Sequence, residues 1–153
     1  MGIKIPDYSI LFERNERGTI IMNDYQPEDY VQYRLNRAKE TIAEIEILIQ
    51  NEYWNTAINR LYYACFYAVG ALLVKNGIET SSHSGCRQKF GQLFVQNGKI
   101  SKDLAKLYTD LFEKRQKGDY NDFFDFDRDT VRRLYEPSKL FIQKIEELIN
   151  ESH

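Results

Sequence analysis

The sequence has few cysteines and lacks several segments that would assign it to a specialised class of protein. Its two cysteines, Cys65 and Cys86, have no metal-binding spacing and are too few for a disulfide framework. No basic start followed by an apolar run marks the N-terminus as a secretion signal. No internal repeat or low-complexity segment is present. We therefore expect a globular protein in a reducing, cytoplasmic environment, with no membrane among its partners.

The stretch from Asn55 to Val74 contains no proline and no acidic residue. Apolar side chains occupy nearly all of its circumference at helical spacing, which is typical of a buried helix. Its length would also suit a membrane span, but Asn55, Asn59 and Arg60 interrupt its first third. We expect a central core helix. Arg60 either covers apolar surface with its stem or has a paired or functional role, and spacing alone leaves both open.

Composition is that of a single globular domain with a sizeable core. The 153 residues are 42% hydrophobic and 29% charged, with a net charge of −2. The charge is uneven, because residues 83–117 carry eight Lys and Arg against three acids, whereas residues 118–153 carry five against nine. A near-neutral total can therefore conceal a basic surface and an acidic one, or two ordinary solvated faces.

The order of apolar stripes, caps and breakers predicts an all-α, antiparallel up-and-down bundle of about five helices, in residues 27–150. The expected helices span residues 27–51, 53–75, 83–96, 101–116 and 127–150. Ser82, Ser101 and Asp127 are the expected N-caps, and Asn76-Gly77 is the expected C-terminal signal. Gly118 should end the fourth helix, and Pro137 should kink or split the fifth. Residues 1–26 form a separate extension, with two short extended pieces around a turn at residues 14–18.

Two local patterns are weak indications of chemistry. Asp125, Asp127, Asp129 and Glu136 have the spacing of a calcium loop, but Thr130 replaces the glycine that the loop requires. Cys86 follows His83 by three residues without a visible orienting group, so a nucleophile pair is poorly supported. We expect no metal and no cofactor.

The segment from Arg115 to Tyr120 is the most informative candidate site. If the helix continues, Arg115 and Asp119 share one face. They then form either a structural ion pair or a device that holds a guanidinium at a fixed angle to grip a phosphate. Lys114 and Lys117 add positive charge.

Three motifs together resemble the HEPN domain, in its branch of small bacterial and archaeal proteins. They are Asn59-Arg-Leu-Tyr-Tyr63-Ala, Thr80-Ser-Ser-His83-Ser-Gly and Arg115-Gln-Lys-Gly-Asp119-Tyr120. The resemblance extends from about Asp29 to Ile149. It implies an antiparallel helical bundle that commonly dimerises. Many such proteins are metal-independent RNases of toxin–antitoxin, CRISPR-linked and abortive-infection systems, and others bind nucleotides or partners beside a small nucleotidyltransferase.

In the active members of the family, an Arg is followed after four to six residues by a His, and two copies form one composite site. Arg115 matches the Arg, but no His follows it before His153, and Asp119 and Tyr120 occupy that region. His83 is the remaining histidine that can act near neutral pH.

The resemblance leads to two functional hypotheses. The first is a nucleotide- or partner-binding module that works with a nucleotidyltransferase-type protein in a toxin–antitoxin or defence setting. Its binding residues would be Arg60, Tyr63, Arg115 and Lys117. The alternative is a metal-independent RNase, with Arg115, Asp119, Tyr120 and His83 as its catalytic residues. RNA is accordingly the second candidate ligand.

A homodimer is expected under either hypothesis. Tyr120, Phe123, Phe124 and Phe126 crowd one acidic loop, and an exposed aromatic cluster commonly marks a contact surface. We expect the segment from Arg115 to Tyr120 to lie at or near the two-fold axis.

Overall fold

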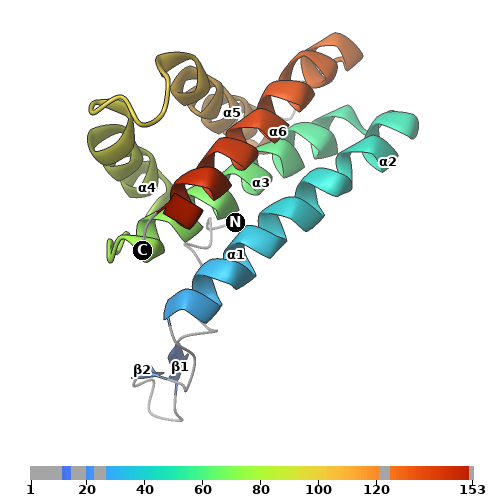
Figure 1. The fold of residues 1–153 in the computed structure, drawn as a ribbon. Helices are drawn as coiled ribbons and strands as arrows, with labels where there is room; N and C mark the ends of the chain where they lie inside the picture. The colour runs from blue at the N-terminus through green and yellow to red at the C-terminus, as the bar shows by residue number, and fades with distance from the viewer. Residues whose placement is uncertain (1–11, 15–19, 23–26, 121–124, 152–153) are drawn as a thin grey trace.

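The computed structural model describes residues 12–14, 20–22, 27–120 and 125–151, and within these ranges the chain is an antiparallel bundle of helices (Figure 1). The helices are α1 (Pro27–Ala43), α2 (Ile45–Gln50), α3 (Trp54–Lys75), α4 (His83–Phe90), α5 (Lys102–Tyr120) and α6 (Arg128–Glu151). A single π-helical turn, Gly91–Val95, follows α4 directly. The predicted all-α bundle is confirmed.

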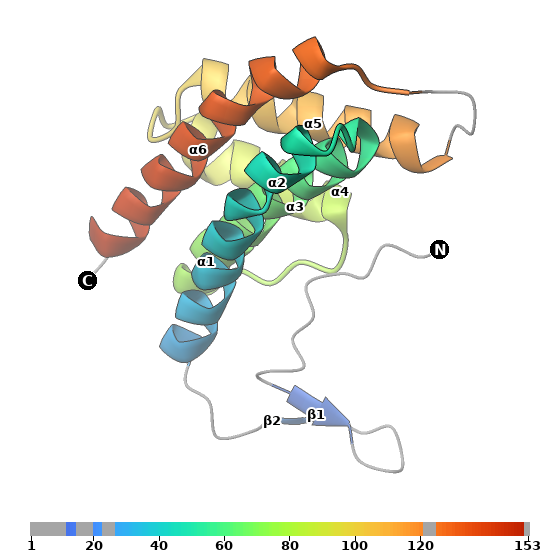
Figure 2. The same ribbon diagram turned by 90° about the vertical axis from the view of Figure 1, so that its right-hand side faces the viewer.

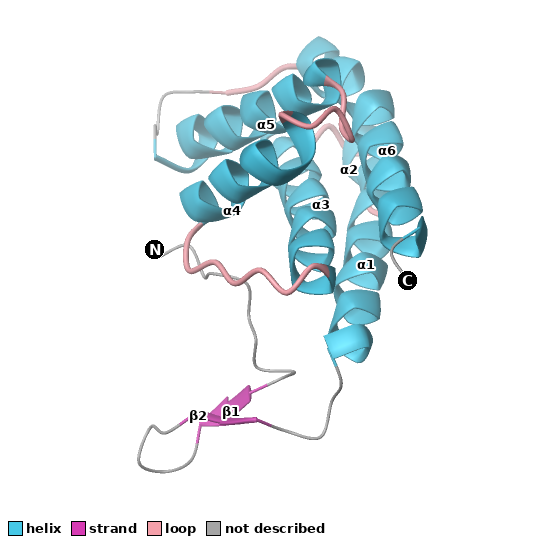
Figure 3. Ribbon diagram, turned by 60° about the vertical axis from the view of Figure 1, so that its left-hand side comes forward, coloured by secondary structure: helices cyan, strands magenta, loops and turns pink. Residues whose placement is uncertain are grey.

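The helix α3 is the centre of the bundle, as its apolar circumference predicts. It packs against α1, α2, α4, α5 and α6, which surround it (Figures 2 and 3). By length and composition α3 could cross a membrane, but 72% of its most apolar window is buried inside the protein. It therefore behaves as the core helix of a folded domain.

The helix ends follow the predicted capping chemistry. Ser82 accepts a hydrogen bond from the backbone N–H of Gly85 at 2.8 Å, and Ser101 accepts one from Leu104 at 3.2 Å. Asp127 accepts one from Thr130 at 2.8 Å. Helix α6 starts at Arg128, so Asp129 and Glu136 lie on a helix and not in a calcium loop.

Several predicted boundaries were wrong. The first helix is interrupted at Glu44, which separates α1 from α2. Gly118 does not end α5, which continues to Tyr120. Pro137 does not split α6, and Ser138 donates its hydroxyl to the Leu134 carbonyl at 2.7 Å in the turn around the proline.

A small antiparallel hairpin precedes the bundle. Strand β1 (Phe12–Arg14) pairs with β2 (Ile20–Met22), and Phe12 lies opposite Met22. These strands flank the predicted turn at residues 14–18, most of which lies outside the described residues. The division of the chain at residue 26 stays a prediction.

Candidate functional site

Arg115 is buried in the core of the bundle, although arginine is rarely found there. It lies on α5 with 1% of its surface exposed. Its guanidinium carbon stands 4.9 Å from the ring centre of Tyr62 and 5.9 Å from that of Tyr63. The Nε and Nη2 atoms have no hydrogen-bond partner among the described residues. A buried cation that is only partly satisfied is costly, so its retention needs a reason.

Asp119 is the one carboxylate that reaches this guanidinium within the described part of the chain. Arg115 donates from Nη1 to Oδ2 of Asp119 at 3.3 Å, one helical turn away. The other oxygen, Oδ1, accepts a weak hydrogen bond from the amide of Asn59 at 3.4 Å. The pair exists because α5 continues through Gly118, where an added Cβ would stand 3.0 Å from the ring of Phe126. Asp119 and Asn59 therefore fix the orientation of Arg115 against α3.

His83 is the first residue of α4 and is 4% exposed. Its ring stacks on Phe66 with centroids 4.3 Å apart, and its Nδ1 lies 2.6 Å from the hydroxyl of Tyr62. Burial raises the pKa of Tyr62, so this hydroxyl keeps its proton and can donate it to Nδ1. The ring proton then resides on Nε2, which has no hydrogen-bond partner among the described residues.

His83 is held in its neutral form. Burial, together with the positive charges of Arg115 and Arg34, lowers its pKa to about 4. His83 and Arg115 both contact the Tyr62 ring, at 5.7 Å between ring centres for the former and 4.9 Å for the latter. The structure thus brings together the two residues that the RNase hypothesis pairs.

Arg34 is a member of the site that sequence analysis missed. It lies on α1, is 3% exposed, and is surrounded by the rings of Tyr67, Phe66 and Tyr30 at 4.9, 5.4 and 5.9 Å. Gly70 provides the room, because a Cβ there would come within 2.7 Å of Nη2 of Arg34. No carboxylate of the described residues lies within ion-pair distance, and Nε and Nη2 lack hydrogen-bond acceptors.

Arg34, His83 and Arg115, which we call the donor cluster, are linked through two rings of α3. Phe66 contacts Arg34 and His83, and Tyr62 contacts His83 and Arg115. Each of the three side chains has at least one buried N–H donor without an acceptor among the described residues. Such a group of donors suits an oxygen-rich anion, above all a phosphate.

The remaining predicted site residues lie around this cluster. Tyr63 lies between two guanidinium groups, 5.9 Å from that of Arg115 and 5.8 Å from that of Arg60. Arg60 pairs with Glu44 at 3.7 Å and donates to Thr41 at 3.4 Å. Lys117 and Tyr120 are exposed on the last turns of α5.

Two further expectations can be compared with the structure. Cys86 is buried, its Sγ lies 2.7 Å from Oγ1 of Thr80, and burial raises its thiol pKa, so it is not an activated nucleophile beside His83. The prediction that Phe126 belongs to an exposed aromatic cluster was wrong, because Phe126 is only 7% exposed. Phe123 and Phe124 of the predicted cluster lie outside the described residues. No group of three or more metal-binding side chains occurs among the residues that the structure describes.

Comparison with known proteins agrees with the bundle and its motifs. Residues 31–148 match the family model of the HEPN domain. A UPF0332 protein of Thermotoga maritima is 37% identical over 126 residues, which cover 82% of this chain and 96% of the relative. Two proteins of Methanocaldococcus jannaschii that carry the name "putative toxin" are 27% and 26% identical. The match to the first of these covers 79% of this chain and 90% of the relative, and the match to the second covers 72% of this chain and 75% of the relative.

Proposed function

The chain belongs to the HEPN domain family, and from this premise we propose that it is a toxin-like module that binds a phosphate-bearing ligand, in the first place a nucleotide, at the donor cluster. The observation that carries the proposal is the set of buried, unsatisfied N–H donors of Arg34, His83 and Arg115. A neutral apolar core would be more stable at these positions, so the donors are best explained by a ligand that accepts from them.

The cluster is preorganised for an anion. Arg34 is held by three rings, and Arg115 is held by two rings and Asp119. Because these contacts fix both guanidinium groups before the ligand arrives, little side-chain entropy is lost on binding. His83 donates from Nε2 as a neutral group and can become positively charged when an anion offsets the repulsion of the two arginines.

The biological setting that we propose is a toxin–antitoxin or defence system in the cytoplasm. Its support is the printed name of the two archaeal relatives and the resemblance to family members that work beside a small nucleotidyltransferase. Such a partner would supply the chemistry, and this chain would supply the bound nucleotide or a docking surface. A pull-down from the native lysate that yields no nucleotidyltransferase would contradict this part of the proposal.

Metal-independent RNA cleavage is the second candidate function. The observation in its favour is that Arg115 and His83 contact the same Tyr62 ring. In this mechanism Arg115 stabilises the phosphate charge and His83 accepts the proton of the 2′-hydroxyl. A pKa of about 4 makes His83 a weak base, and this places cleavage second.

One pair of assays distinguishes the two functions. Calorimetry with a nucleotide panel, and with the matching nucleosides as a reference, should give phosphate-dependent binding that is lost in Arg115→Met and retained in Arg133→Met, which removes an arginine that is 61% exposed on α6. Incubation of the same proteins with RNA in EDTA should leave the RNA intact. Cleavage by the wild type that Arg115→Ala abolishes, without nucleotide binding, would reverse the ranking.

We also propose a symmetric homodimer with the end of α5 near the two-fold axis. Support comes from the resemblance to dimerising family members and from Tyr120, which is 61% exposed on the last turn of α5. Light scattering at micromolar concentration should give twice the monomer mass, and Phe123→Ser/Phe124→Ser should reduce it. A monomeric wild type would refute the dimer, and an intact dimer in the variant would place the interface elsewhere.

A further inference from the structure

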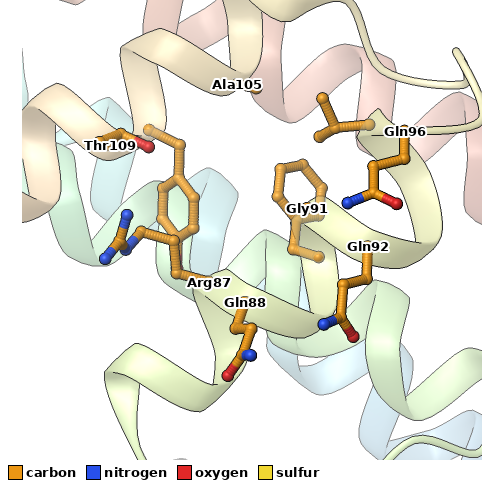
Figure 4. A pocket seen from close by; sticks show the side chains of 10 residues that line it. Arg87, Gln88, Gly91, Gln92, Gln96, Ala105 and Thr109 are labelled. Atoms are coloured by element: carbon orange, nitrogen blue, oxygen red, sulfur yellow. The ribbon is translucent and has the colours of Figure 1, made fainter.

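A pocket of about 420 Å³ lies between α5 on one side and α4 with its π-helical turn on the other (Figure 4). Its size falls within the range of about 300–1,000 Å³ that is typical of small-molecule sites. None of its lining residues belongs to the donor cluster. The pocket is therefore a separate candidate site, and its ligand can be inferred independently of the proposed function.

The inner wall of the pocket is aromatic. Phe90 and Tyr108 line it and are each 1% exposed, with their rings 5.7 Å apart at an angle of 82°. Two small residues also line it, Gly91 in the π-helical turn and Ala105 in α5. Apart from the adjacent residues and the backbone of its own helix, no described atom lies within 4 Å of the position that a Cβ of Gly91 would occupy, so the space beside it is open. A flat ring can enter beside Gly91 and rest on apolar surface.

The rim of the pocket is polar, and none of the described residues that line it is acidic. Gln88, Gln92 and Gln96 line it at intervals of four residues, the last two from the π-helical turn and its end. Among the described residues that line the pocket only Arg87 is charged, and it stands with Thr109 on the side opposite Gln92 and Gln96 (Figure 4). The Arg87 guanidinium carbon lies 4.5 Å from the ring centre of Phe112, which restrains the guanidinium, and the buried Nε of Arg87 lacks a hydrogen-bond partner among the described residues.

This combination selects a particular ligand chemistry. An apolar wall with several amides and one guanidinium, but no carboxylate, favours a flat ring with hydrogen-bonding atoms along its edges. Arginine donates well to two adjacent acceptors on one ring edge, as in the O6/N7 edge of guanine, and glutamine amides can accept from the donors on the opposite edge. π-Helical turns are frequent at functional sites, and here the turn carries Gly91 and Gln92. We propose that this pocket binds a purine base, with a guanine-type ring preferred.

The test uses the side-chain amide signals of the glutamines in the NMR spectrum of the full chain. Guanosine, uridine and inorganic phosphate are titrated separately. Guanosine should shift the amide signals of Gln92 and Gln96, uridine should bind at least tenfold more weakly, and phosphate should leave these signals unchanged. A short single-stranded RNA with one guanine, compared with the same RNA carrying uracil instead, tells whether the base arrives free or within RNA.

Two variants fill the pocket from opposite walls. Gly91→Leu and Ala105→Leu should each weaken guanosine binding at least tenfold, whereas Gln143→Leu, which adds the same side chain to an exposed position of α6, should leave it unchanged. The backbone spectrum of each variant reports whether it is folded. If one of the two variants does not fold, the other still tests the proposal. Absence of glutamine shifts with guanosine and with the guanine-containing RNA would overturn the proposal, as would unweakened binding by both filled variants. Loss of phosphate-dependent nucleotide binding in Arg115→Met tests the donor cluster alone, because guanosine carries no phosphate.

Discussion

Protonation of His83 should destabilise the folded protein, and the size of the effect can be worked out from its environment. In the unfolded chain the imidazole has a pKa near 6.5, whereas burial and the two neighbouring arginines lower the folded value to about 4. This difference corresponds to about 3 kcal/mol. The folded state binds a proton at His83 more weakly than the unfolded chain does. The contribution of neutral His83 to the free energy of unfolding is therefore fully present above pH 6.5 and is lost as the pH falls from 6.5 towards 4. At pH 5 the loss should be about 2 kcal/mol.

Chemical unfolding of the wild type and of His83→Gln at pH 7.5 and pH 5 measures this effect. Glutamine does not titrate, so the contributions of carboxylates and of His153 cancel in the comparison. The difference in free energy of unfolding between the two proteins should fall by about 2 kcal/mol between these pH values. A difference that does not change with pH, or a His83 ring signal that titrates near 6.5, would refute the account of a buried neutral imidazole between two cations.

Three further changes test the packing around the site. Arg34→Met should leave the free energy of unfolding unchanged or raise it by about 1 kcal/mol, because an unpaired buried cation is replaced by an apolar side chain of similar length; a loss of more than about 2 kcal/mol would show that the ring contacts outweigh burial. Asn55→Ala should lower the free energy of unfolding by about 1–2 kcal/mol, because Asn55 donates to Asp125 at 2.9 Å and accepts from the Phe126 N–H at 2.7 Å. Urea unfolding without such a loss would contradict this prediction. Pro137→Ala should raise the free energy of unfolding by about 1–3 kcal/mol, because it restores a backbone N–H donor in the interior of α6. An unchanged thermal midpoint would refute this prediction.

Much of the fold could be predicted because it depends on local signals. The all-round apolar pattern from residue 55 to 74 identifies the core helix, and Ser82, Ser101 and Asp127 mark three helix starts. The predictions failed where tertiary contacts override local preference. Gly118 lies within α5 because its missing Cβ leaves room for Phe126, and nothing in the local sequence shows that contact.

The candidate site was only partly predictable for a similar reason. Sequence motifs named His83, Arg115 and Asp119, but they could not show that the two former meet on the ring of Tyr62. Arg34 falls off the apolar stripe expected for its helix because arginine is usually exposed. Its four-residue spacing from Tyr30 and from Ala38 was the signal that could have placed it on the buried face.

The central claim is that the donor cluster binds an anion, and the pKa of His83 is the most direct probe of that binding. NMR titration of the ring signals is carried out in inorganic phosphate and in chloride of equal ionic strength, with His153 as the internal reference. A phosphate bound at the donor cluster offsets the repulsion of Arg34 and Arg115 on a protonated His83, so we expect it to raise the pKa of His83 by about one unit or more while that of His153 is unchanged. The same His83 pKa in both salts, or an equal shift of both histidines, would contradict the claim.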